Sequence, residues 1–207
     1  MQVRNTRERY GAVAKLLHWL MLVLLAGMVA LGLYMEDLPV QEKMPGAFGY
    51  VLYQLHKSFG FVALALALVR LVWRLVNPAP PAPREHGVLL VWAAHASHVL
   101  LYVLMFAMPV TGWLYVSADP LSHTMIPTRF FDTFVIPNLL DADQALRDFF
   151  RGLHGLLADV LMITVGVHAA AAIGHHVVFR DDVLVRMLPF ARPRPPAAEE
   201  QTRTRNA

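Results

Sequence analysis

The chain has 207 residues, of which 57% are hydrophobic and 16% are charged, and its net charge is +3 at pH 7. Soluble globular domains usually contain about 25% charged residues, so this composition argues against a soluble globular protein. The sequence has no cysteine, which excludes disulfides, iron–sulfur clusters and every cofactor that is attached through cysteine. The small net charge gives no reason to expect a nucleic-acid partner.

Four long apolar segments account for this composition. A helix needs about 20 mainly apolar residues to cross the hydrocarbon core of a membrane, and each segment is long enough. The predicted spans are about residues 11–34, 50–76, 88–116 and 149–179. The predicted fold is therefore all-α, a transmembrane four-helix bundle that forms one domain over residues 1–190.

The first span follows a basic N-terminal stretch, so a cleaved signal peptide is the alternative to a retained helix. Its apolar run from Leu16 to Tyr34 is longer than the roughly 7–15 residues of a signal-peptide core. We therefore expect the helix to be retained. The proline-rich run from Asn77 to Arg84 ends the second span, because proline lacks the backbone amide that a helix interior needs.

The longest predicted loop covers about residues 117–147, between the third and fourth spans. Its aromatic residues Phe130, Phe131 and Phe134 suggest that part of the loop lies on the membrane surface. After the fourth span, residues 191–207 are rich in proline, alanine, arginine and glutamate. Such a composition buries too little apolar surface to fold, so we expect a disordered cytoplasmic tail.

Basic residues are distributed unequally between the two sides of the predicted bundle. With four spans, the N-terminus, the connector of residues 74–84 and the C-terminal segment share one side and carry most of the arginines. The loops on the other side, about residues 35–49 and 117–147, are richer in aspartate and glutamate. Basic segments stay in the cytoplasm by the positive-inside rule, so both termini are predicted to be cytoplasmic.

Histidines within the spans sort by depth into two levels. His18 lies a few residues into the first span from the cytoplasmic side, whereas His56 enters with the second span from the outer side. The fourth span also enters from outside, so His154 is in the outer half and His168, 14 residues later, lies about 21 Å further in. A histidine in hydrocarbon usually has a partner. The predicted pairs are His56 with His154 and His18 with His168.

Two imidazoles from different helices at one depth suit the iron of a six-coordinate haem b, because the porphyrin supplies four nitrogens and each histidine supplies one. The four histidines are thus predicted axial ligands of two b-type haems in the bundle core, one near each face. Small residues after His56 on the same helix face leave room for a flat macrocycle, although they would equally allow close helix packing. Arg70 follows at the depth of the inner pair, where it would bind a haem propionate or extend to the headgroups.

Other interpretations stay open at this point. Histidines in a span can serve packing, and a haem-free transporter of protons or metal ions could also use them. Zinc, however, usually has carboxylate or thiolate ligands too, and only Asp159 lies mid-span. His95 and His98, three residues apart in the third span, could replace His18 or His168 as ligands, or line a quinone or propionate site.

Six short segments resemble the bacterial cytochrome b561 family of small di-haem inner-membrane proteins, and they occur in the family's order. They are residues 15–19 (KLLHW), 55–60 (LHKSFG), 69–74 (VRLVWR), 94–98 (AHASH), 153–155 (LHG) and 166–176 (GVHAAAAIGHH). The resemblance covers roughly residues 8–190. It implies that His18, His56, His154 and His168 are the axial ligands, in agreement with the depth argument.

The resemblance also implies a function and a location. Members of this family are multi-pass proteins of the bacterial inner membrane that move electrons between a periplasmic donor and membrane quinone, and at least one is regarded as oxidising superoxide and reducing ubiquinone. Similar cytochromes anchor hydrogenases and formate dehydrogenases, which is the alternative role. The expected partners are membrane lipid, quinone, and a periplasmic donor or redox partner subunit. Whether the chain is an oxidoreductase or only an electron carrier stays open.

Overall fold

The computed structural model describes residues 2–81 and 87–191. Its four long helices are α1 (Ala12–Glu36), α2 (Phe48–Val76), α3 (Val88–Ala118) and α4 (Gln144–Gly174). A π-helix, η3 (His175–Phe179), continues α4 and is followed by the short helix α5 (Val183–Met187). The loops contain the 3-10 helices η1 (Val40–Lys43) and η2 (Pro120–His123) and the strands β1 (Arg129–Phe130) and β2 (Phe134–Val135).

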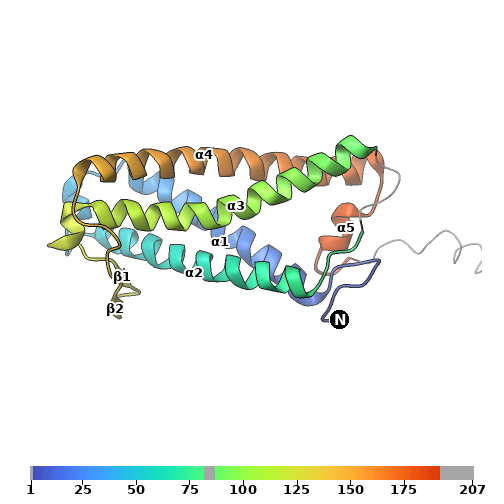
Figure 1. Ribbon diagram of the computed structural model, residues 1–207, viewed down its shortest axis with the longest axis horizontal. Coiled ribbons are helices and arrows are strands. Elements are labelled where there is room, and N and C mark those ends of the chain that lie inside the picture. The colour runs from blue at the N-terminus through green and yellow to red at the C-terminus, as the bar shows by residue number, and fades with distance from the viewer. Residues whose placement is uncertain (1, 82–86, 192–207) are drawn as a thin grey trace, which may run out of the picture.

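The long helices run alternately up and down the bundle, as Figure 1 shows. α4 packs along α3, α1 packs along α2, and α2 also contacts α3. We call the end with the N-terminus, the end of α2, the start of α3 and α5 the terminal end. The opposite end, where β1 and β2 project beside α2, is the loop end (Figure 1). The predicted four-helix transmembrane bundle is confirmed, because in the described chain four helices are long and apolar enough to cross a membrane.

Apolar side chains cover the outside of the bundle as well as its centre. The centre contains a cluster of Met21, Ala67 and Met105. On the outside, residues such as Val103 and Ile163 are more than half exposed. A soluble protein would bury such side chains, whereas a bundle in lipid presents them to the hydrocarbon while its helices satisfy their own backbone hydrogen bonds.

The fourth helix begins five residues before the predicted start at residue 149. The Asp143 side chain accepts a hydrogen bond of 3.0 Å from the Leu146 amide and so caps the helix at Gln144. The first turn of α4 includes Gln144 and Arg147, so the apolar run that marks the span begins later. Residues 192–207, on which nearly all of the predicted disordered tail falls, lie outside the described part of the chain.

The segment after α4 folds back against the start of α1. Arg180 has a positive φ of 54°, which ends η3 and reverses the chain. Lys15 then donates a hydrogen bond of 2.7 Å to the Leu188 carbonyl, and the Trp19 indole donates one of 3.0 Å to the Met187 carbonyl. These contacts attach α5 to the terminal end of the bundle.

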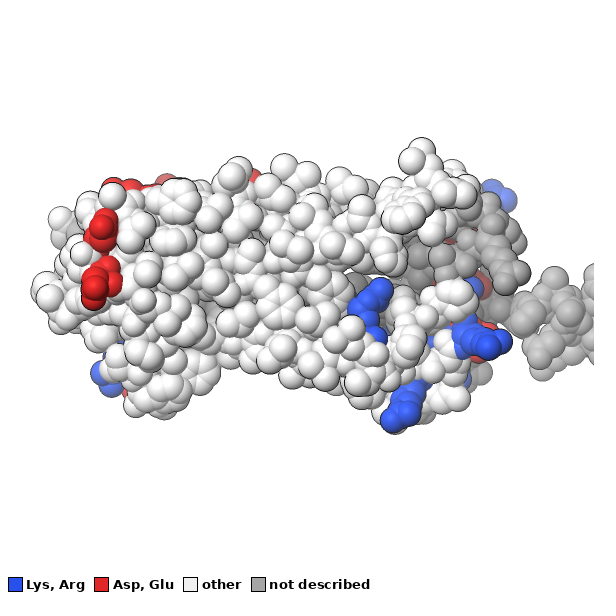
Figure 2. Space-filling model, in the orientation of Figure 1, with Lys and Arg blue, Asp and Glu red and all other residues white. Residues whose placement is uncertain are grey.

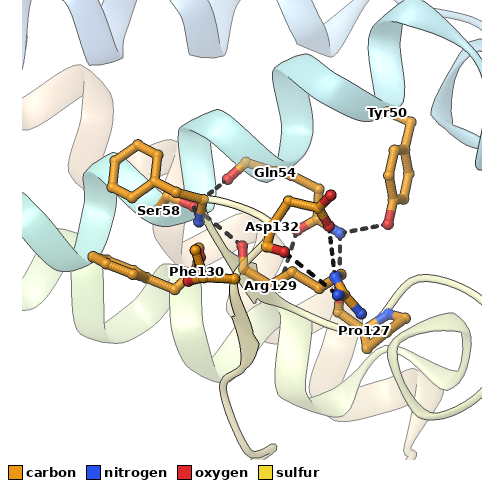
Figure 3. Close-up of polar contacts among 9 residues, drawn as sticks. Tyr50, Gln54, Ser58, Pro127, Arg129, Phe130 and Asp132 are labelled. Carbon is orange, nitrogen blue, oxygen red and sulfur yellow. Dashed lines mark hydrogen bonds and ion pairs between the residues drawn. The ribbon is translucent and has the colours of Figure 1, made fainter.

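Two polar residues on α2 hold the long loop against the bundle, as Figure 3 shows. The Gln54 amide donates to the Pro127 carbonyl at 2.8 Å and accepts from the Arg129 amide at 3.2 Å. The fully buried Ser58 hydroxyl accepts from the Phe131 amide at 2.9 Å, and the Arg129 carbonyl lies 3.2 Å from it. Gln54 and Ser58 therefore give the β1–β2 hairpin the hydrogen bonds that a third strand would otherwise supply.

Replacement of Ser58 by alanine should loosen the hairpin without unfolding the bundle. The lost hydrogen bond is worth about 0.5–1.5 kcal/mol, so amide exchange at residues 129–135 should become roughly twofold to tenfold faster. Hydrogen–deuterium exchange in detergent measures this. Thr164→Ala is the matched control, because among the described residues the Thr164 hydroxyl bonds only to the Val160 carbonyl of its own helix. Equal exchange rates in both variants would contradict the proposed anchoring.

Candidate functional site

The first histidine pair lies toward the loop end and joins α2 to α4. The ring centroids of His56 and His154 are 6.5 Å apart. The Nδ1 atom of His154 lies 3.2 Å from the Thr111 hydroxyl of α3. The Nδ1 atom of His56 is buried and has no hydrogen-bond partner among the described residues.

Both rings of this pair lie against a glycine of a neighbouring helix. A Cβ atom placed on Gly112 would lie 3.1 Å from Cε1 of His154, and one on Gly32 would lie 3.3 Å from Cε1 of His56. Real Cβ contacts are rarely this short, so any larger residue would displace the imidazole. Gly32, Thr111 and Gly112 are not among the residues predicted from the sequence, because nothing in the local pattern shows which helix faces meet.

The second pair lies toward the terminal end and joins α1 to α4. The ring centroids of His18 and His168 are 6.3 Å apart. A third imidazole, that of His98 on α3, lies 5.3 Å from His168 by the same measure. Its neighbour His95 is exposed. The structure thus brings together the residues of each predicted pair, and it adds His98 to the level of His18 and His168.

Arg70 also lies at the terminal-end level. One of its guanidinium nitrogens is 3.1 Å from Nδ1 of His18, and the other is 3.5 Å from the Leu17 carbonyl. The guanidinium is 5.8 Å from the ring centroid of Tyr102. The Arg70 side chain therefore turns toward His18, whereas one of the two predicted positions was at the headgroups.

The spacing within each pair fits one metal ion between two imidazoles. A metal–imidazole bond is about 2 Å, and a ring nitrogen lies about 1 Å from its ring centroid, so two rings on opposite sides of one ion have centroids about 6 Å apart. The observed values are 6.5 Å and 6.3 Å. Both distances are compatible with one ion held between two imidazoles.

The composition of the site also favours a cofactor that brings its own ligands. Over residues 2–81 and 87–191, no group of three or more His, Cys, Asp or Glu side chains could bind a metal ion. Asp159 is exposed on α4. Two histidines leave the shell of a bare zinc ion incomplete, but they complete the coordination of a porphyrin-bound iron. The residues at both levels therefore fit haem iron better than a bare metal ion.

The two levels differ in their electrostatic surroundings. At the loop end, the neutral Thr111 hydroxyl lies 3.2 Å from Nδ1 of His154, and a glycine lies against each ring. At the terminal end, the guanidinium of Arg70 lies beside His18, and that of Arg74 lies 5.9 Å from the Tyr102 ring. A positive charge beside a redox centre favours its reduced form, so the same cofactor would have different potentials at the two levels.

Known proteins of similar sequence cover nearly the whole chain. The family model described as prokaryotic cytochrome b561 matches residues 9–190. Cytochrome b561 homolog 2 of Escherichia coli (strain K12) is 34% identical over 188 residues, which are 91% of this chain and 95% of that protein. The probable superoxide oxidase CybB of Yersinia pestis is 26% identical over 185 residues, which are 89% of this chain and 98% of that protein.

Proposed function

The chain belongs to the prokaryotic cytochrome b561 family, and we propose that it transfers electrons across the bacterial membrane through two b-type haems, one at each histidine level. Membership of this family makes the chain a membrane cytochrome b. The observation that carries the proposal of two haems is the spacing of the paired imidazole rings, 6.5 Å at the loop end and 6.3 Å at the terminal end.

In this proposal, His56 and His154 hold one haem and His18 and His168 hold the other. When bound, the haems supply the one-electron chemistry. The helices contribute fixed positions and a dry, apolar surrounding for the imidazoles, and Gly32 leaves room for the ring of His56.

Arg70 has two tasks in this proposal. Beside His18 it supplies a positive charge that raises the potential of the terminal-end haem, and its remaining donors are available to a propionate. A higher potential at the terminal end would direct electrons from the loop end toward the terminal end.

The proposed orientation places both termini in the cytoplasm of a bacterium, so that the loop end faces the periplasm. Electrons then enter from a periplasmic donor and leave to a membrane quinone. Superoxide is the donor that the name of the Yersinia pestis relative suggests, with ubiquinone as the acceptor that we propose. The loop that carries the β1–β2 hairpin is hydrogen-bonded to α2 at Gln54 and Ser58, which lie two residues before and two residues after His56 in the sequence.

Single histidine variants test the assignment of ligands. His154→Ala should remove or alter only the loop-end haem, and His18→Ala only the terminal-end haem, because each imidazole is an axial ligand at one level. Low-temperature optical spectra and electron paramagnetic resonance of the purified variants resolve the two signals. His123→Ala, in η2, is a control that should keep both signals. Two unchanged haem signals in His154→Ala would refute the pairing.

Removal of the Arg70 charge should lower the midpoint potential of one haem only. A partly exposed charge contributes about 1 kcal/mol, on the order of 50 mV for one electron, so Arg70→Gln should lower the terminal-end potential by about that amount. Arg70→Lys keeps the charge and should restore most of the potential. Redox titration of the two haem signals measures both effects. An equal shift at both haems, or a shift of the loop-end haem alone, would contradict the placement of Arg70.

A further inference from the structure

A groove opens on the outside of the bundle between α2 and α3, separate from the histidine pairs. Its volume is about 470 Å³, and its walls are almost wholly apolar. The lining residues are Leu71 of α2 and Tyr102, Val103, Phe106, Ala107 and Val110 of α3. Figure 2 shows a hollow on this face between α3 and the C-terminal part of α2, with a basic side chain beside it. Because the groove lies on the surface of a transmembrane bundle, its contents come from the membrane.

Positive charge lies at one end of this groove. Tyr102, one of the lining residues, has the guanidinium of Arg74 5.9 Å from its ring centroid. Within the described residues, Arg74 has no carboxylate within 4 Å and no side-chain hydrogen bond, whereas Arg70 is already engaged with His18. Arg74 is therefore the guanidinium that is free to bind an anion at the mouth of the groove.

The length of the groove corresponds to part of one membrane leaflet. From Tyr102 to Val110 the lining residues of α3 span eight steps along the helix, or about 12 Å. One leaflet of the hydrocarbon core is about 15 Å thick. An acyl chain that begins beside Arg74, in the last turn of α2, would thus follow the groove toward the middle of the membrane over most of one leaflet.

We propose that this groove binds one anionic phospholipid from the leaflet at the terminal end. The phosphate pairs with Arg74, because guanidinium groups bind phosphate oxygens through charged hydrogen bonds. One acyl chain lies along Val103, Phe106 and Val110. Basic pockets between transmembrane helices are known to select anionic headgroups in this way. The proposed lipid contacts involve neither haem nor quinone, and they share only Arg74 with the charges of the terminal-end level.

The test uses the purified, haem-loaded protein and counts bound lipid by native mass spectrometry. The probes are phosphatidylglycerol and phosphatidylcholine with identical acyl chains, and ubiquinone as a competitor. We expect one tightly held phosphatidylglycerol per chain and at least fivefold weaker retention of phosphatidylcholine, because only the former carries a net negative charge.

Two variants separate the headgroup contact from the chain contact. Arg74→Gln should weaken phosphatidylglycerol binding about fivefold and remove most of the preference over phosphatidylcholine. Val103→Trp fills the groove and should weaken both lipids while the charge stays in place. Arg7→Gln is the matched control, because it makes the same change in charge at an exposed position of the terminal end and should bind like the unaltered protein. Circular dichroism and haem content establish that each variant is folded.

Three outcomes would overturn the proposal. Equal binding of the two phospholipids would show that the groove does not select lipids by the charge of their headgroup. Unchanged phosphatidylglycerol binding in a folded Arg74→Gln or Val103→Trp variant would place the lipid elsewhere. Displacement of phosphatidylglycerol by stoichiometric ubiquinone would identify the groove as a quinone site instead.

Discussion

A polar side chain inside a hydrocarbon layer must meet another polar group or a cofactor, and this constraint shapes the core of the bundle. α1, α2 and α4 carry histidines whose rings meet at two levels, with ring centroids 6.3 Å and 6.5 Å apart. The antiparallel order of the helices brings residues far apart in the sequence to the same depth. α4 contributes to both levels through His154 and His168. Thr111 and Arg70 are further polar side chains beside the paired rings, at the loop end and the terminal end respectively.

Each level contains a pair of histidines, but the surroundings of the two pairs differ, and under the proposed haem ligation this difference would favour one direction of electron flow. Gly32 and Gly112 admit the loop-end imidazoles without adding charge. At the terminal end, Arg70 reaches the Nδ1 atom of His18 and His98 lies beside His168. Identical haems in these places would have unequal potentials, because potential depends on nearby charge and hydrogen bonding.

Much of this arrangement could be predicted from the sequence, since the length of an apolar run and the order of spans determine depth. The 14 residues between His154 and His168 were enough to predict two levels and to match each with a histidine of another helix. The rotational orientation of a helix about its own axis does not follow from the sequence as directly as its depth does. The glycine contacts, the orientation of Arg70 and the role of Ser58 all depend on it, and they became visible only in three dimensions. The early start of α4 depends on a single cap, Asp143, in a polar turn.

The measurement that tests the central claim most directly is a reduced-minus-oxidised visible spectrum of the purified protein, with haem counted as the pyridine haemochrome. The claim is that each pair of histidines holds one haem. The account predicts a sharp band of low-spin b-type haem and two haems per chain. One haem per chain, or none, in protein produced with an adequate supply of haem would contradict it.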